Sequence, residues 1–405
     1  MIKIIEGGVC AAKGFLANGI HCGIRKNKAK KDLSLIYSEG VASAAAVYTT
    51  NKVKGAPLTV TKNNISDGYA KAIICNSGNA NTCNANGIEI AEETCSLLAS
   101  ELGISEKDVV VASTGVIGQP LDIEPIKNGI PALVKELGKN KSQDAAEGIM
   151  TTDTKLKEIA VSFEIGGKLC KMGGIAKGSG MIHPNMATML VFITTDCKIS
   201  PEMLSKGLSS DIANTFNMVS VDGDTSTNDM VTILANGYAD NVEITEEGED
   251  FNVFMKALNT VTVYLCKKIA ADGEGATKLL ECSVKGAKDL KNAKIIAKSV
   301  ICSSLVKAAM FGSDANWGRV LCAIGYSGAE VDVNKVNVSF ISKKGEIEVC
   351  KVGAGVEFSE EKAKEILLED EITIDITLGD GDASSVAWGC DLTYDYVKIN
   401  GDYRT

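Results

Sequence analysis

The stretch KGSGMIHPNMATMLVFITTD, from Lys177 to Asp196, joins a loop to a strand. Its first half holds glycines and a proline, which break regular structure, and MLVFI in its second half is an apolar run typical of a buried strand. Thr188 follows the small Ala187 at the junction. A turn that enters a core strand would explain this pattern without any chemistry. The alternative interpretation is that Thr188 is a nucleophile.

Size and charge limit the classes of protein. At 405 residues, 45% of them hydrophobic, the chain can bury a large core, and its length predicts ~2 to 3 domains. The net charge of −10 argues against nucleic acid or an anionic membrane as a partner, because either would need a clustered basic surface. We interpret the one dense basic run, RKNKAKK at Arg25–Lys31, as a solvated loop.

The sequence shows no targeting or membrane segment. The opening MIKIIEGGVCAAKGF lacks the apolar region of a signal peptide, and no later apolar run approaches the ~20 residues of a membrane span. We therefore expect a cytoplasmic protein.

Cysteine and histidine usage argues against a metal site. Thirteen cysteines are scattered without a C-x-x-C pair, and the chain has two histidines, His21 and His183. This predicts reduced, mostly buried thiols and no structural zinc. A Ser-His-Asp or Cys-His arrangement would have to use one of these two histidines, so acyl-transfer chemistry would need another base.

Nucleotide-binding motifs fail on their spacing. In GGIAKGSG, from Gly173 to Gly180, the lysine follows alanine and precedes glycine, which does not fit a P-loop. DGEGATK at Asp272 and LGDGDASS at Leu378 lack the third glycine of a dinucleotide fingerprint. We expect neither an NTP nor a nicotinamide cofactor.

Strand and helix signals alternate along the chain. Ser200 at an N-cap and Pro201 after it mark one helix start, and Ser359 followed by two glutamates marks another. MLVFI is apolar on both faces, which is typical of a sheet covered on both sides. The prediction is a mixed α/β fold in layers. Strands are expected at 108–113, 157–165, 189–195, 335–341 and 371–378, and helices at 88–102, 124–137, 201–215, 251–270, 316–325 and 359–368.

Four polar stretches interrupt this pattern. They are VASTGVIG at Val111, IMTTDTK at Ile149, ADGEGATK at Ala271 and NGDYRT at Asn400. Thr114-Gly115 directly follows a predicted strand, and such a strand-to-turn junction can aim donors at an oxyanion. Each stretch by itself is typical of a plain turn.

Taken together, these motifs resemble one family. KGSGMIHPNMATM, the Thr-Gly of VASTGVIG, TTDT at Thr151, VYTTNKVKGAP at Val47, NSGNAN at Asn76 and SVDGDTSTND at Ser220 are similar to motifs of the ornithine acetyltransferases, also called glutamate N-acetyltransferases or ArgJ proteins. The resemblance runs from Gly7 to Thr405. It implies an αββα-type sandwich, as in DmpA and ArgJ proteins, with an N-terminal-nucleophile-like architecture.

The resemblance implies self-cleavage between Ala187 and Thr188. The products would be an α chain of residues 1–187, with the oxyanion hole and part of the substrate site, and a β chain of residues 188–405, assembled as α2β2. The new α-amine of Thr188, with a reference pKa of ~7.7 to 8.0, would supply the missing base. The implied ping-pong reaction of arginine biosynthesis moves the acetyl group of N2-acetylornithine to glutamate through acetyl-Thr188.

The family's functional positions transfer to this sequence one by one. Thr114 and Gly115 match the oxyanion pair. A cation such as Lys177 suits the substrate carboxylate and Glu274 suits an ammonium group, although isolated charges of this kind are typical of solvated loops. His183 has no assigned role, and we expect it to make a structural hydrogen bond. The implied substrate-binding residues are Thr151, Thr152, Lys177, Thr188, Glu274, Asn400 and Thr405.

Three questions stay open at this point. Family members differ in whether acetyl-CoA also donates the acetyl group, and no residue here decides; otherwise no cofactor and no metal are expected. A related self-processing aminopeptidase or amidase would pass the acyl group to water instead. A catalytically silent scaffold is disfavoured by the intact set of Thr114, Gly115, Lys177 and Thr188.

Overall fold

The computed structural model describes residues 1–183 and 189–401. The chain forms two compact units, which are described separately. Unit 1 contains residues 1–178, 189–213 and 225–265, and unit 2 contains residues 179–183, 214–224 and 266–401.

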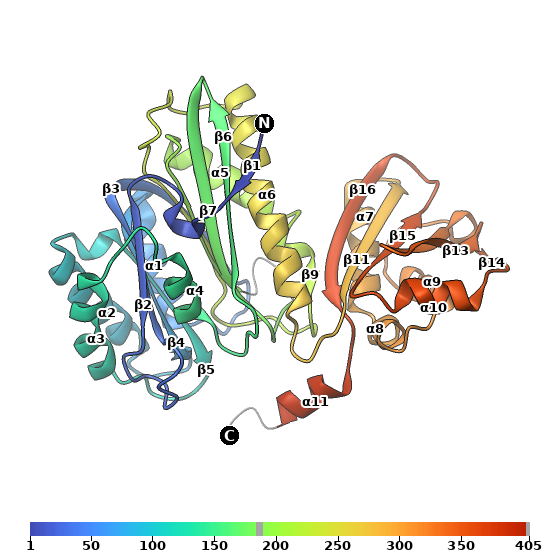
Figure 1. Cartoon of the computed structure of the whole chain (residues 1–405), viewed down its shortest axis with the longest axis horizontal. Helices are drawn as coiled ribbons and strands as arrows, with labels where there is room; N and C mark the ends of the chain where they lie inside the picture. The colour runs from blue at the N-terminus through green and yellow to red at the C-terminus, as the bar shows by residue number, and fades with distance from the viewer. Residues whose placement is uncertain (184–188, 402–405) are drawn as a thin grey trace. The chain divides into compact units, whose positions relative to one another are not determined.

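Unit 1 is built on a sheet of nine described strands (Figure 1). The strand order is β1-β6-β7-β8-β10-β3-β4-β5, and β2 pairs with β3. The parallel neighbours β8 and β10 lie inside this order, and all their residues are buried, so the sheet is covered on both faces there. The bounds are β1 Lys3–Ile5, β2 Phe15–Ile20, β3 Leu33–Tyr48, β4 Tyr69–Asn79, β5 Val109–Val116, β6 Lys157–Ile165, β7 Lys168–Lys177, β8 Leu190–Thr195 and β10 Met230–Ala235.

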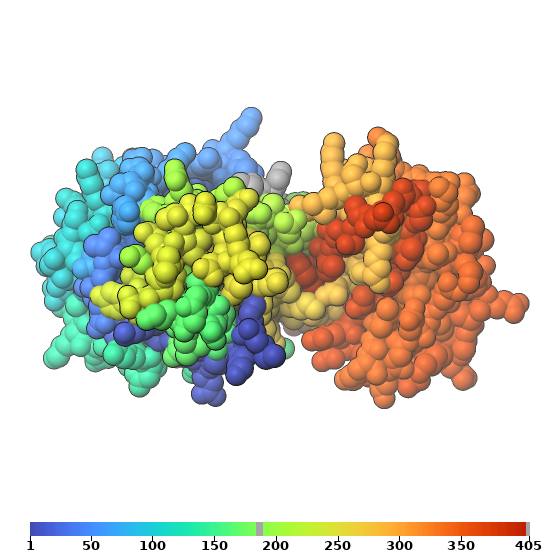
Figure 2. Space-filling view, turned by 90° about the horizontal axis from the view of Figure 1, so that it is seen from above, coloured from blue at the N-terminus to red at the C-terminus, as the bar shows by residue number. Residues whose placement is uncertain are grey.

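Helices cover both faces of this sheet. Leu98 of α2 and Ile130 of α3 belong to one apolar core, and Ala145 and Ile149 of α4 belong to another. The yellow atoms of α6 cover part of the surface of unit 1 in Figure 2. The bounds are α1 Ala56–Asn64, α2 Gly87–Leu102, α3 Glu124–Lys135, α4 Ser142–Ile149, α5 Pro201–Ile212 and α6 Glu249–Ala271.

Unit 2 contains a sheet of seven described strands in the order β14-β13-β12-β15-β11-β16-β9. Its strand β11 pairs parallel with β15 and antiparallel with β16. The strand bounds are β9 Val219–Ser220, β11 Leu279–Ala287, β12 Asn337–Ser342, β13 Gly345–Lys351, β14 Ala354–Gly355, β15 Glu371–Thr377 and β16 Ala383–Cys390. The helices are α7 Leu290–Cys302, α8 Ser304–Phe311, α9 Trp317–Gly325, α10 Glu360–Leu367 and α11 Tyr394–Gly401.

The mixed α/β class and its layers are confirmed. The predicted strands correspond to β5, β6, β8, β12 and β15, and the predicted helices to α2, α3, α5, α6, α9 and α10. Both predicted caps are present, because Ser200 Oγ accepts from the Met203 N–H at 3.3 Å and Ser359 Oγ from the Lys362 N–H at 3.2 Å. No described helix has both the length and the apolar character of a membrane span.

The interpretation of the basic run as a solvated loop is wrong at its two ends. Residues 26–30 are exposed, but Lys31 pairs with Glu147 at 2.9 Å and Arg25 Nη2 donates to the Met150 carbonyl oxygen. All thirteen cysteines are free thiols and most are buried, as predicted.

Candidate active site

Thr114 and Gly115 lie within β5, not at a turn after it. The strand continues to Val116, and its parallel pairing with β4 becomes irregular at Gly78 and Asn79. Gly115 has φ of +130°, and a Cβ at this residue would lie 2.3 Å from the carbonyl carbon of Gly78. Only glycine fits such a close approach of two backbones. The expected strand-to-turn junction is therefore wrong: the pair lies at an irregularity inside the strand, where Thr114 is buried and Gly115 is half-buried.

A buried amide supports this part of β5. Asn228 lies two residues before the start of β10, and its Nδ2 donates to the carbonyl oxygens of Ser113 at 3.0 Å and Ala80 at 2.5 Å. Its Oδ1 accepts from the hydroxyls of Thr82 at 2.5 Å and Thr227 at 2.6 Å. Asn228 therefore fixes the residue immediately before Thr114.

Asp153 brings the Thr151–Thr152 turn to the end of β7. Its carboxylate accepts from the Thr151 N–H at 3.0 Å, the Gly178 N–H at 2.7 Å and Lys157 Nζ at 2.7 Å. Burial raises the pKa of Asp153, but the ammonium groups of Lys157 and Lys177 outweigh burial and hold the pKa well below its usual range. The negative charge thus stays in place beside Lys177.

Lys177 itself is a buried cation at 9% exposure, not a solvated loop charge. It is the last residue of β7 and pairs in register with Leu190, which pairs in turn with Met230 of β10. Leu190 is two residues beyond Thr188 in the sequence. The register therefore sets Lys177 across from the start of β8.

The last turn of α4 and the strands β4 and β5 are tied at the same end of the sheet. Ser77 Oγ donates to the Gly148 carbonyl oxygen at 2.7 Å, and Ser77 pairs in register with Thr114. Unit 1 thus gathers three of the predicted segments: Thr114–Gly115, Thr151–Thr152 and Lys177. The predicted residues Ala187, Thr188 and Thr405 lie outside the described residues.

Unit 2 brings two further predicted residues together. Asn400 Nδ2 donates to Glu274 Oε2 at 2.8 Å, and Glu274 is 7% exposed. A Cβ at Gly180 would lie 2.3 Å from the carboxyl carbon of Glu274, so this carboxylate lies directly against the Gly-Ser-Gly part of the opening stretch. Glu274 is therefore held in a defined place and is not a solvated charge.

His183 makes the kind of structural contact expected for it. Its Nδ1 lies 3.1 Å from Ser220 Oγ and 3.5 Å from Cys302 Sγ. Burial, and then repulsion from Lys298, lowers the pKa of His183 to about 4, so the imidazole is neutral at pH 7.

Comparison with known proteins identifies the family of this chain. A model of the ArgJ family matches residues 16–405. The chain belongs to the ArgJ family. It is 50% identical over 405 residues to an "Arginine biosynthesis bifunctional protein ArgJ" of Caldanaerobacter subterraneus subsp. tengcongensis, covering 100% of both chains. It is 51% identical over 392 residues to ArgJ 1 of Clostridium acetobutylicum, covering 96% of each.

A solved structure gives the same family. The crystal structure of ArgJ from Bacillus halodurans is 46% identical, with a TM-score of 0.50, and the match covers 53% of this chain and 98% of that one. The ArgJ resemblance and the ArgJ-like architecture predicted from the motifs are confirmed.

Sequence reasoning missed one acid near this ArgJ site. Asp229 is buried beside Asn228, and its Oδ2 has no hydrogen-bond partner among the described residues. Burial raises its pKa well above the usual range, and the hydrogen bond from Ser226 and the charge of Lys177 offset this only in part. Burial therefore favours the protonated form of the Asp229 carboxyl group. The sequence signal was the motif SVDGDTSTND, which ends at Asp229 directly before a buried strand and contributed to the resemblance without indicating a role for this acid.

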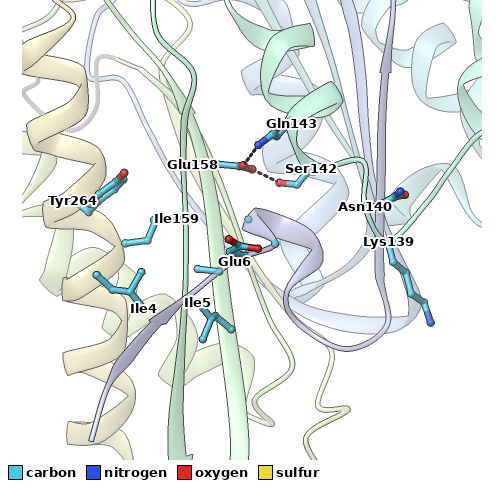
Figure 3. Close-up of a pocket in the computed structure, with 13 residues that line it drawn as sticks. Ile4, Ile5, Glu6, Lys139, Asn140, Ser142, Gln143, Glu158, Ile159 and Tyr264 are labelled. Atoms are coloured by element: carbon cyan, nitrogen blue, oxygen red, sulfur yellow. Dashed lines mark hydrogen bonds between the residues drawn. The ribbon is translucent and has the colours of Figure 1, made fainter.

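One cavity of about 730 Å³ in unit 1 contains none of the predicted ArgJ site residues (Figure 3). Ile4 and Ile5 of β1, Tyr264 of α6 and Glu158 of β6 contribute to its lining. The Glu158 carboxylate already accepts from Ser142 Oγ at 2.8 Å and Gln143 Nε2 at 2.9 Å. This cavity is therefore separate from the predicted site residues.

Proposed function

We propose that this chain is a self-processing acetyltransferase of arginine biosynthesis that moves the acetyl group of N2-acetylornithine to glutamate. The observation that carries the proposal is the gathering of Thr114–Gly115, Thr151–Thr152 and the buried Lys177 at one end of the unit 1 sheet. The chain enters β8 beside this end, immediately after Thr188 and Met189.

The first step is cleavage of the chain. The Thr188 hydroxyl attacks the carbonyl carbon of Ala187, and hydrolysis of the resulting ester gives the α chain of residues 1–187 and the β chain of residues 188–405. The freed α-amine of Thr188 then takes the hydroxyl proton when its neutral form is present.

Acetyl transfer follows in two halves. The Thr188 oxygen bonds to the acetyl carbonyl carbon of N2-acetylornithine, and the developing oxyanion is stabilised by donors at Thr114 and Gly115. The amide C–N bond breaks, and ornithine leaves with the proton. The α-amine of glutamate attacks the acetyl-Thr188 ester, releases the hydroxyl and leaves as N-acetylglutamate.

Charged groups orient the two amino acids. Lys177, together with Thr151 and Thr152, serves the substrate α-carboxylate, and Glu274 with Asn400 and Thr405 serves the side-chain ammonium of ornithine. The buried position of Lys177 supports its assignment to the carboxylate. The attraction between an ammonium group and a carboxylate is stronger away from bulk water, because the effective dielectric constant is lower there.

The relatives named bifunctional support a second donor. We include acetyl-CoA as an alternative acetyl donor, acting as a substrate and not as a bound cofactor. We also assign the protein to the cytoplasm as an α2β2 assembly. A related amidase would pass the acetyl group to water, and the biosynthetic names of the relatives do not favour it.

The test is a product analysis. Purified protein receives N2-acetylornithine with glutamate, acetyl-CoA with glutamate, or N2-acetylornithine alone, and N-acetylglutamate and acetate are quantified. Acetylglutamate should exceed acetate, and mass spectrometry should find one acetyl group on the peptide that begins at Thr188. Acetate as the main product in the presence of glutamate would instead establish the amidase.

A further inference from the structure

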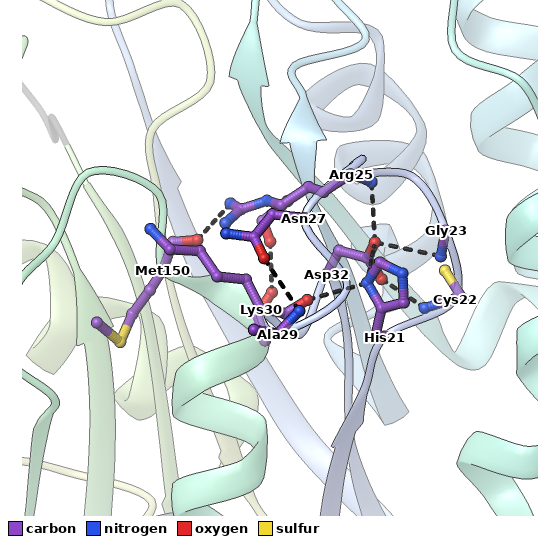
Figure 4. Close-up of polar contacts among 11 residues, drawn as sticks. His21, Cys22, Gly23, Arg25, Asn27, Ala29, Lys30, Asp32 and Met150 are labelled. Carbon is purple, nitrogen blue, oxygen red and sulfur yellow. Dashed lines mark hydrogen bonds and ion pairs between the residues drawn. The ribbon is translucent and has the colours of Figure 1, made fainter.

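Arg25 lies on a loop that a single buried carboxylate organises (Figure 4). Asp32 is fully buried and accepts from the backbone N–H groups of Cys22 at 2.6 Å, Gly23 at 3.2 Å and Arg25 at 2.9 Å. Its carboxylate also lies 3.1 Å from His21 Nδ1. Because these contacts fix the loop between β2 and β3, the backbone of Arg25 is held before any ligand binds.

The side chain of Arg25 reaches the candidate active site of unit 1. Nη2 donates to the carbonyl oxygen of Met150, the residue before Thr151. The side chain also crosses Gly78, where a Cβ would lie 2.8 Å from Arg25 Cγ, and Gly78 is the backbone that Gly115 contacts. Arg25 therefore contacts Gly78, which packs against the oxyanion segment, and Met150, which precedes the Thr151 turn.

Arg25 and Lys177 both act electrostatically on the buried Cys75. Burial raises the pKa of the Cys75 thiol to about 12, and the charges of Lys177 and Arg25 both oppose this rise. Cys75 lies on β4, three residues before Gly78. Two cations thus act on one end of the sheet in unit 1.

The proposed reaction leaves one substrate charge without an assigned partner. This inference rests on the proposed function. Ornithine and glutamate share an α-carboxylate, but the ornithine side chain ends in an ammonium group and the glutamate side chain ends in a second carboxylate. Lys177 is assigned to the α-carboxylate and Glu274 to the ammonium group. Neither is assigned to the side-chain carboxylate of glutamate. We propose that the guanidinium of Arg25 binds the side-chain carboxylate of the acceptor glutamate, because its planar fork of donors fits a carboxylate.

The alternative is that Arg25 only ties the loop to Met150. Loss of a purely structural contact would slow both halves of the reaction. Loss of a contact with the acceptor would slow only the half in which glutamate takes part. The two halves can be measured separately, since ornithine release reports acetylation of the enzyme and loss of the acetyl group reports transfer to the acceptor.

The experiment compares wild type, Arg25→Gln and Arg25→Lys, with Lys26→Gln as a control at the adjacent exposed cation. For Arg25→Gln we expect ornithine release from N2-acetylornithine within about threefold of wild type, and KM for glutamate raised by about 10²-fold. The glutamate KM of Arg25→Lys should lie between those of wild type and Arg25→Gln, and the control should match wild type. Wild type should prefer glutamate to glutamine as acceptor, and Arg25→Gln should lose most of that preference.

Two results would overturn the inference. One is an equal fall in the rates of ornithine release and of acetyl transfer to glutamate, with the preference for glutamate over glutamine retained. That result would give Arg25 a purely structural role. Thermal melting of each variant identifies misfolding, and if Arg25→Gln does not fold, the glutamate KM of Arg25→Lys decides. The other is a wild-type protein that forms no acetyl-enzyme from N2-acetylornithine; this outcome removes the proposed function itself and is distinguishable from a failure at Arg25 alone.

Discussion

Replacing Asn228 with alanine should destabilise unit 1 and weaken the oxyanion segment together. The amide of Asn228 is 5% exposed and donates to the carbonyl oxygens of Ala80 and Ser113. Alanine leaves both buried oxygens without this donor, and each lost partner costs ~1 to 3 kcal/mol. We therefore expect the free energy of unfolding to fall by about 3 kcal/mol, with a small added cost for the cavity.

The assay is urea unfolding at a fixed protein concentration, followed by acetyl transfer under conditions in which the variant is folded. Because Ser113 precedes Thr114, the folded variant should also have a kcat lower by about tenfold or more. This is less than the loss expected when an oxyanion donor is removed altogether, since the donor is only displaced. Asn334→Ala, at an exposed asparagine, is the control and should stay within about 0.5 kcal/mol of wild type. An Asn228→Ala protein with unchanged urea midpoint and unchanged kcat would refute the assignment of Asn228 as a support for the oxyanion strand.

Three further outcomes follow from the site. Thr188→Ala should remain a single uncleaved chain without transferase activity, and a normally processed product on a denaturing gel would remove Thr188 from the mechanism. Thr114→Ala should fold but lose ~10²-fold or more in kcat, and activity within a few-fold of wild type would mean that other groups hold the oxyanion. Asp153→Asn should lower the free energy of unfolding at pH 7 by about 3 kcal/mol, because it leaves Lys157 buried without its carboxylate. Since the pKa of Asp153 in the folded protein is depressed, its contribution to the free energy of unfolding is present above pH ~4 and is lost as pH falls below that value. The difference in unfolding free energy between wild type and Asp153→Asn, measured by denaturation at pH 7 and at pH ~3, should therefore be smaller at the lower pH. A difference that grows in acid would contradict the ion pair.

Local signals predicted the elements whose sequence and environment agree. β8 is a short apolar run, and α5 begins with Ser200 and Pro201 in the order a helix start requires. β3 was not predicted because LSLIYSEGVASAAAVY is rich in alanine, which has weak strand propensity. Its extended conformation comes from pairing with β2, β4 and β10, which are remote in sequence.

The same distinction applies to the site. Thr114, Lys177 and Glu274 could be named because they belong to motifs that resemble a family. Asn228 lies in the motif SVDGDTSTND, but its role, like that of Asp32, could not be predicted, since each acts by holding a backbone: Asn228 bonds Ser113, which is 115 positions away, and Asp32 bonds a loop that looked like a solvated basic run. Partners of this kind become visible only when the fold brings them together.

The position of β8 and β10 in the sheet has a consequence for the cleaved protein. Both strands follow residue 188, but they are inserted between β7 and β3, which precede it. Six residue pairs join β7 to β8, and six more join β10 to β3. Cutting the chain before Thr188 would therefore produce two polypeptides whose strands remain interleaved in a single sheet. Hydrolysis would free the α-amine of Thr188, but the two polypeptides would stay associated. Neither polypeptide expressed alone could complete this sheet, and mixing separately unfolded halves should restore activity only if they refold together.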